Sequence, residues 1–232
     1  MPMITGSKFT IVWRLSVVAV LCAGLLGMGH AAEPRLAIED LTLRADAGDR
    51  SAIRTLAEAY YAGSGGAAQD FTKAADWYRR LAKLGDPQAQ TSLGLMYARG
   101  YGVTKNLTEA HRWWNFAAAQ NDPAAQYNLG LTYVQGDGVP IDYALAARWF
   151  REAARRGHVQ AQHNYGLLLH EGRGVARDPL QAYYWLKVAA LQGDERSQRV
   201  LTSLAAALND AQRREADAQA DEWMSARQKS SP

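Results

Sequence analysis

Residues 122–157 decide the fold, and they read DPAAQYNLGLTYVQGDGVPIDYALAARWFREAARRG. Asp122 followed by Pro123 is a typical opening of a helix, an N-cap residue before a proline in the first turn. A Gly-Asp-Gly turn interrupts that helix, and a second one opens at Asp142 and stops at Gly157. Each helix has one apolar face with helical spacing. These faces consist of Ala125, Leu129 and Tyr133 in the first helix, and of Ala146, Trp149, Phe150, Ala153 and Ala154 in the second. The stretch therefore predicts a helix–loop–helix pair.

The same pair recurs every 36 residues. Tryptophan keeps the step at Trp77, Trp113, Trp149 and Trp185, and glycine keeps it at Gly94, Gly130 and Gly166. One pair cannot bury its own apolar face, so stacked copies should share a continuous core. We expect the small residues to let the helices approach and the repeat tryptophans to fill the core. The prediction is an all-α, right-handed solenoid of four pairs with helical caps at both ends.

The repeated pattern A-x-x-x-L-G-x-x-Y…G-x-G-V…D-x-x-x-A-x-x-W-x-x-x-A-A resembles the Sel1-like repeat. That family is a variant of the tetratricopeptide repeat with a longer loop between its two helices. The resemblance covers residues 49–194, which divide into copies at 49–85, 86–121, 122–157 and 158–193. The first copy departs most, with Ala57 in place of the glycine and Gly66 in place of the valine.

The segments outside the repeats predict an export signal and two caps. Residues 1–31 combine a basic start, an uncharged run over 15–28 and small residues before a cleavage site after Ala31, as secretory signals do. We expect a periplasmic or secreted protein without a stable membrane span. An uncleaved N-terminal anchor is the alternative. Residues 32–48 should form an N-terminal capping helix. Residues 195–228 should form C-terminal capping helices with Trp223 and Met224 as apolar anchor, and 229–232 a disordered tail.

Composition narrows the chemistry. The single cysteine, Cys22, lies in the export signal, so the mature chain would have no disulfide, cysteine-bound zinc or thiol nucleophile. Loss of that segment also removes Lys8 and Arg14 from the 26 basic residues, leaving a near balance with 23 acidic ones, and no nucleic-acid partner is expected.

Neither the sequence motifs nor the histidines indicate a catalytic site. No phosphate loop, dinucleotide fingerprint or nucleophile elbow occurs in the sequence. His163 and His170 stand two turns apart on one face, but neither has a carboxylate four residues on to complete a metal site. We therefore expect no metal, no cofactor and no enzyme. A pH-sensing role of these histidines remains open.

The first helix of each copy has a second face that the core does not require. In the third copy this face is partly apolar, and in solenoids the first helices line the concave side. The stripe consists of Arg54, Glu58, Tyr61, Thr91, Leu95, Ala98, Tyr127, Asn128, Leu131, Val134, His163, Asn164, Leu167 and His170. An exposed apolar strip commonly marks a binding site. The alternative is that neighbouring helices or a cap cover it.

The functional hypothesis is an exported adapter that binds a protein or peptide through this concave stripe. Envelope assembly, regulation and host interaction all suit such a protein. Two other classes stay open: an envelope hydrolase acting on cell-wall or antibiotic substrates, and a self-assembling structural solenoid. The sequence leaves the oligomeric state undetermined.

Overall fold

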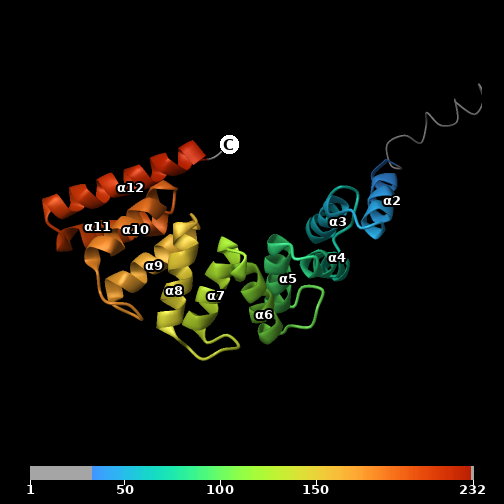
Figure 1. The fold of residues 1–232 in the computed structure, drawn as a ribbon, viewed down its shortest axis with the longest axis horizontal. Coiled ribbons are helices and arrows are strands. Elements are labelled where there is room, and N and C mark those ends of the chain that lie inside the picture. The colour runs from blue at the N-terminus through green and yellow to red at the C-terminus, as the bar shows by residue number, and fades with distance from the viewer. Residues whose placement is uncertain (1–32, 231–232) are drawn as a thin grey trace, which may run out of the picture. The chain divides into compact units, whose positions relative to one another are not determined.

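The computed structural model describes residues 33–230, so the predicted export signal at 1–31 lies outside the described residues. The chain divides into two compact units, Met1–Asp70 and Phe71–Pro232, each described below by itself. Over residues 33–230 the regular structure is helical throughout; in the second unit successive helices from α4 to α11 pack against each other in chain order, and α12 packs back against α10 (Figure 1). The all-α prediction is confirmed.

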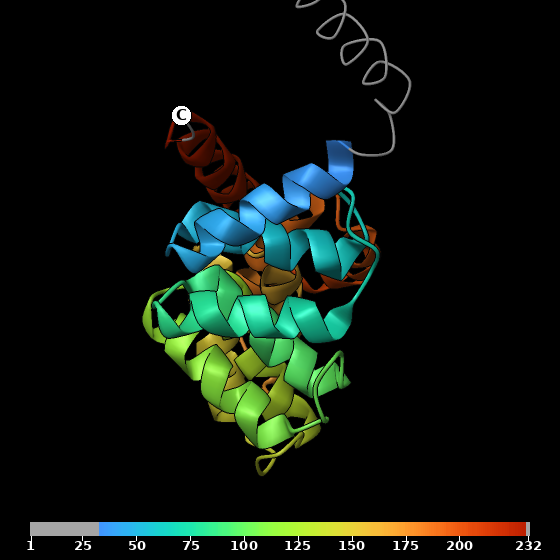
Figure 2. The same cartoon turned by 90° about the vertical axis from the view of Figure 1, so that its right-hand side faces the viewer.

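In the first unit, α2 (Glu33–Asp46) and α3 (Arg50–Ala62) pack side by side (Figure 2). Asp49 caps α3, because its carboxylate accepts from the backbone N–H of Ser51 at 2.9 Å, and it also pairs with Arg44. Ala45 of α2 is fully buried. The helix at 33–46 thus lies where the sequence predicts an N-terminal cap.

The second unit contains the remaining helices. In chain order they are α4 (Phe71–Lys83), α5 (Pro87–Arg99), α6 (Leu107–Ala119), α7 (Pro123–Gln135), α8 (Tyr143–Arg155), α9 (Val159–Glu171), α10 (Pro179–Leu191), α11 (Glu195–Leu204) and α12 (Asp210–Ser230), with a short 3₁₀ turn over Ala205–Ala207. We call α5, α7 and α9 the A helices, and α4, α6, α8 and α10 the B helices. The helix α12 includes residues 229 and 230, which the sequence assigns to a disordered tail.

The helix ends follow the predicted signals. Asp122 accepts from the Ala125 N–H at 2.8 Å, and Asn106 caps α6 in the same way. Asn121 takes the place of the glycine that follows other B helices and has φ of 66°, the left-handed conformation that asparagine tolerates. Local side-chain chemistry therefore fixes where each helix begins and ends.

Glycine on each A helix makes room for one large side chain of the following B helix. A Cβ on Gly130 would lie 2.5 Å from the ring of Phe150, and one on Gly94 would lie 2.5 Å from the indole of Trp114. Gly166 stands in the same relation to Leu186. Real atoms do not approach this closely, so the glycines set the distance between paired helices.

The core residue of each B helix is not the repeat tryptophan but the residue after it. Phe150 is 1% exposed, whereas Trp149 is only half-buried. Trp77 and Trp113 are half-buried as well, and only Trp185 of the four is buried. Adjacent residues of a helix point about 100° apart. When one of them points at the glycine of the facing helix, the tryptophan before it therefore points to the side of the helix pair and not into its core. The prediction that the tryptophans form the core is thus wrong for three copies.

Buried glutamines tie each A helix to the end of the preceding B helix. The side-chain amides of Gln90 and Gln162 donate to the carbonyls of Ala82 and Ala154 at 3.1 and 3.2 Å. Gln126 does the same more weakly towards Ala118, at 3.4 Å. Each of these carbonyls also accepts a backbone N–H from the turn that ends its helix, from Gly85, Asn121 and Gly157, so the glutamine supplies a second bond that fastens the next helix to this turn.

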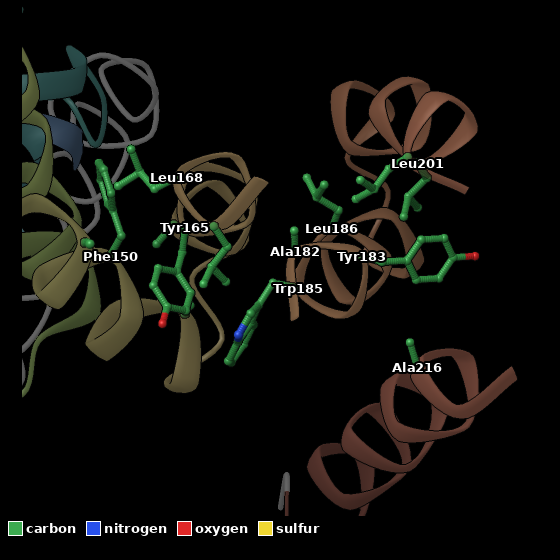
Figure 3. Packing of buried hydrophobic residues seen from close by; sticks show 14 of the residues in the cluster. Phe150, Tyr165, Leu168, Ala182, Tyr183, Trp185, Leu186, Leu201 and Ala216 are labelled. Atoms are coloured by element: carbon green, nitrogen blue, oxygen red, sulfur yellow. The ribbon is translucent and has the colours of Figure 1, made fainter. Parts of the chain in front are cut away.

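The C-terminal helices cover the last repeat. Tyr183 of α10 lies between Leu201 of α11 and Ala216 of α12 (Figure 3). Ala216 and Ala220 are 1% and 0% exposed, and Lys187 pairs with Asp217 at 2.9 Å. These alanines, rather than the predicted Trp223 and Met224, are the fully buried anchor of α12; the two larger side chains are half-buried. Among the described residues, no helix is both long and apolar enough to cross a bilayer.

Candidate functional site

The A helices of the second unit carry two pockets in the predicted stripe. The first pocket has a volume of about 290 Å³ and the second about 270 Å³. The first is lined by Leu95, Ala98, Arg99, Lys105, Leu107, Trp114, Asn128, Leu131, Thr132, Gln135 and Asp137. The second is lined by Leu131, Val134, Tyr143, Phe150, Asn164, Leu167, Leu168, Glu171 and Arg173. Leu131 belongs to both, so the two pockets adjoin.

The second pocket is a copy of the first. Each of its lining residues stands 36 positions after a residue that lines the first pocket. The floor is the core side chain of the B helix, Trp114 in one pocket and Phe150 in the other. The upper wall is apolar, with Leu131 and Leu167 at equivalent positions. The pocket is therefore a product of the repeat itself, formed wherever two successive A helices meet one B helix.

The rims of the two pockets differ in charge. Exposed Arg99 and Lys105 stand against a single carboxylate, Asp137, at the first pocket. At the second, Arg173 pairs with Glu171 at 3.3 Å. The first rim therefore has a surplus of one positive charge, while the second is neutral.

Arg173 also covers one wall of the second pocket. Its guanidinium carbon lies 3.9 Å from the centre of the Tyr143 ring, within the range of a cation–π contact. This contact links the loop after α9 to the start of α8, and it keeps the rim of the pocket in place.

Some residues of the stripe join one A helix to the next instead of lining a pocket. Thr91 donates to the Asp122 carboxylate at 2.9 Å, and the Tyr127 ring stacks on the His158 ring with centres 4.5 Å apart. Because Asp122 and His158 cap the following A helices, these side chains join one A helix to the next.

His163 continues this series at the junction with α11. It is 7% exposed, and its Nδ1 lies 2.8 Å from the Ser197 hydroxyl and 3.4 Å from the carboxylate of Asp194, which caps α11. Burial lowers the pKa of His163; Asp194 opposes that shift and Arg196 adds to it. The structure thus places His163 inside a helix junction rather than on an open surface.

The cluster of Ser197, His163 and Asp194 contains the residue types of a hydrolase triad in another geometry. In a triad, one ring nitrogen faces the serine and the other faces the carboxylate. Here both partners contact Nδ1, and Ser197 is 0% exposed. A substrate therefore cannot reach the hydroxyl, and the cluster is suited to holding helices together.

Tyr127 and His170, two more polar residues of the stripe, differ in their surroundings. Burial raises the pKa of Tyr127, whereas the charge of Arg196 and a hydrogen bond from the Asn164 amide lower it. His170 is half-buried, and its Nδ1 has no hydrogen-bond partner within residues 33–230. It does not line either pocket.

In the part of the chain that the structure describes, no three His, Cys, Asp or Glu side chains gather as metal ligands would.

The three stripe residues on α3 belong to the first unit. Glu58 is exposed, and Arg54 and Tyr61 are half-buried. The pockets of the second unit are therefore described without them.

Comparison with known families gives four consecutive matches to the Sel1 repeat, at residues 51–86, 87–122, 123–158 and 159–194. The chain belongs to the Sel1 repeat family. Sel1 repeats generally form protein-interaction scaffolds. A comparison with curated protein sequences gave no match.

Solved structures of Sel1 proteins resemble this chain closely. A protective antigen of uropathogenic Escherichia coli strains is 33% identical over 78% of this chain, with a TM-score of 0.70. A Sel1 repeat protein from Oxalobacter formigenes is 34% identical over 67% of the chain, with a TM-score of 0.62. The chain spans 40% of the length of the antigen and 63% of the Oxalobacter protein. The Sel1 solenoid fold is shown, while the activities of those longer proteins are not thereby transferred.

The sequence reasoning missed the pocket residues that lie outside the A helices. Trp114, Phe150 and Tyr143 come from the B helices, and Lys105 and Arg173 come from the loops of the Sel1 repeat. A signal for them existed, because the 36-residue step carries a lining residue of one pocket to the equivalent lining residue of the next. That step was used to find the core and was not applied to the residues around the stripe.

Proposed function

We propose that this Sel1 protein is an exported adapter that binds a protein or peptide partner across the two pockets of its A helices. The observation that carries the proposal is the repetition of one pocket at a one-repeat interval, with Leu131 shared between the copies. Adjacent pockets of similar size favour a ligand that itself repeats, such as a peptide that places one apolar side chain in each.

The nature of the pockets supports a polypeptide ligand. Each has an aromatic floor and leucine walls, which suit an apolar side chain, and a polar asparagine, Asn128 or Asn164, at its edge for contacts with a peptide backbone. Packed helices lie about 8–10 Å apart, a distance that a peptide in the polyproline II conformation covers in roughly three residues, which is one full turn and returns the side chain to the same side. Apolar residues three positions apart would then enter successive pockets. The basic rim at Arg99 and Lys105 favours an acidic residue at one end of that segment.

Export rests on the N-terminal sequence. The basic start, the uncharged run over 15–28 and the small residues before Ala31 support a cleaved signal and a periplasmic or secreted location. The Sel1 relative from uropathogenic E. coli is a protective antigen, which fits exposure outside the cytoplasm. A role as binding protein rather than enzyme is supported by the buried geometry of the Ser197 cluster.

The test uses the residue that both pockets share. Leu131→Asp places a charge in both pockets, and Leu191→Asp is the matched control because Leu191 is an exposed leucine at the end of α10. Envelope proteins captured by the parent chain and by each variant are compared by quantitative mass spectrometry after crosslinking. We expect a captured protein that is lost with Leu131→Asp and retained with Leu191→Asp.

The folding of both variants is followed by circular dichroism, so that loss of capture is read only from folded protein. If a folded Leu131→Asp variant captures the same proteins as the parent chain, the pockets are not the binding site. If the melting temperature of this variant alone collapses, Leu131→Ser, which adds no charge, repeats the test.

A further inference from the structure

A third cavity lies on a different side of α7 and α8 from the two pockets. It has a volume of about 300 Å³ and is lined by Tyr133, Leu145, Arg148, Trp149, Arg151 and Glu152. Tyr133 of α7 is neither a stripe residue nor a lining residue of the two pockets. We call this cavity the Trp149 pocket, and it is independent of the function proposed above.

The four repeat tryptophans allow an internal comparison. The guanidinium of Arg80 lies 4.4 Å from the Trp77 ring, and that of Arg112 lies 5.8 Å from the Trp113 ring. Phe116 also packs on Trp113, with ring centres 5.7 Å apart. With Trp185, described next, the indole is contacted by a ring or a guanidinium of the protein in three of the four copies.

The fourth copy follows the same rule, and the third does not. Tyr184 and Tyr165 contact the Trp185 ring at 4.9 and 6.0 Å. Among the described residues, no aromatic ring and no cation covers Trp149. The half-buried indole instead forms a wall of the cavity, so the third copy leaves open a place that the other copies fill.

The charge around this open indole selects the kind of group that fits. Glu152 is the one carboxylate of the lining, and it already lies 3.1 Å from Arg156, 3.7 Å from Arg151 and 3.9 Å from Arg155. Positive charge therefore exceeds negative charge on this part of α8. A cation would be repelled from the place that Arg80 takes over Trp77.

Two arginines remain to receive an anion. Arg148 is exposed and makes no ion pair within residues 33–230. Arg151 lies beside it, with its Nε 3.7 Å from the Glu152 carboxylate and its guanidinium in contact with the Tyr165 hydroxyl, and its side chain is 42% exposed. Because Glu152 is shared among three arginines, a ligand carboxylate would pair with the exposed parts of these two guanidinium groups.

We propose that the Trp149 pocket binds a planar aromatic group that carries a carboxylate. The ring packs against Trp149 beside Tyr133, as aromatic rings pack edge-on against Trp113 and Trp185, and the carboxylate pairs with Arg148 and Arg151. The volume is at the lower end of the range for small-molecule sites, which suits a ligand of one or two fused rings.

The probe is naphthoate, titrated into the purified full-length chain labelled with ¹⁵N. The indole N–H signal of Trp149 is assigned from its disappearance in Trp149→Phe, and its shift reports binding at this site. We expect a saturating shift with a dissociation constant of about 1 mM, the range that ligand size sets. Naphthalenemethanol, with the same ring and no charge, should bind about tenfold more weakly.

Matched variants test the role of the arginine. Arg148→Ser should weaken naphthoate binding about tenfold. Arg112→Ser removes the same charge at the equivalent position of the second copy and should leave binding unchanged. The peptide acetyl-Phe-Asp-amide forms a second arm. If this peptide binds more tightly than naphthoate, the natural ligand of the Trp149 pocket is an aromatic side chain of a protein partner. If it binds more weakly, the natural ligand is a free aromatic acid.

Three results would overturn the proposal. They are the lack of a saturating shift of the Trp149 signal at about 10 mM naphthoate, equal affinity for the neutral probe, and equal weakening by Arg148→Ser and Arg112→Ser. Both arginines are surface residues, so the folds of the two variants can be compared directly by their NMR spectra.

Discussion

Replacement of Phe150 by alanine should destabilise the second unit more than replacement of its neighbour Trp149. Phe150 is 1% exposed, and its ring lies against the backbone of Gly130, where no side chain is present to relax into the gap. Trp149 is larger but only half-buried, and it borders an open cavity. The smaller residue therefore contributes more to stability.

The magnitude follows from burial. Truncation of a buried phenylalanine costs about 3–5 kcal/mol, which in a domain of this size lowers the melting temperature by roughly 6–20 °C. Truncation of the half-buried indole removes about half as much apolar contact and should cost about 2 kcal/mol. Phe150→Leu should cost only about 1 kcal/mol, because Leu186 takes the same place opposite Gly166 in the fourth copy.

Urea unfolding of the three variants measures these differences. Circular dichroism and tryptophan fluorescence are recorded together, because a solenoid can unfold in parts and a single transition must be demonstrated. If Trp149→Ala costs as much as Phe150→Ala or more, the repeat tryptophan is the core residue after all and the assignment from burial fails.

Three further outcomes are expected. Gly130→Ala should lower stability by about 1 kcal/mol in urea, because its overlap with Phe150 outweighs the gain of about 1 kcal/mol in helix propensity; a rise in stability would contradict the close approach. Acidification should destabilise the chain, because burial lowers the pKa of three histidines, and the unfolded chain, with ordinary pKa values of about 6.5, then binds protons that the folded chain does not. Those residues are His111, His158 and His163. Urea midpoints that stay level as the pH falls from 7 to about 5 would refute this. N-terminal sequencing of protein extracted from the envelope should begin after Ala31, and a chain that still carries residues 1–31 would favour the anchor.

The parts of the fold that depend on local chemistry could be predicted from the sequence. Asp122 and Pro123 mark a helix start in any surroundings, and Asn121 tolerates the backbone conformation that ends a helix. The number and order of helix pairs follow from the 36-residue step. Because these features depend on a few neighbouring residues or on the length of the repeat, they can be predicted from the sequence.

Which residues of a helix face the core, and which face a pocket, was predicted less well. Trp149 and Phe150 are adjacent and both aromatic, and only the position of Gly130 on the facing helix decides which one enters the core. Of the residues in the stripe, Leu131 lines both pockets, whereas His163, to which the same role was assigned, is buried at the junction with α11. The sequence pattern does not show what a cap covers, because caps do not repeat.

The junctions between successive A helices have a consequence for how the chain avoids errors in assembly. Nearly identical neighbouring modules can exchange partners during folding, a known hazard of repeat proteins. Here one junction pairs a hydroxyl with a carboxylate, the next stacks two rings, and the third pairs an imidazole with a hydroxyl. A module docked onto the wrong neighbour would set Thr91 against His158, or Tyr127 against Asp194, and would exchange the native contact for a different one. Each copy thus meets its successor through a contact of its own, and side chains that the family pattern leaves free to vary make the junctions unlike one another.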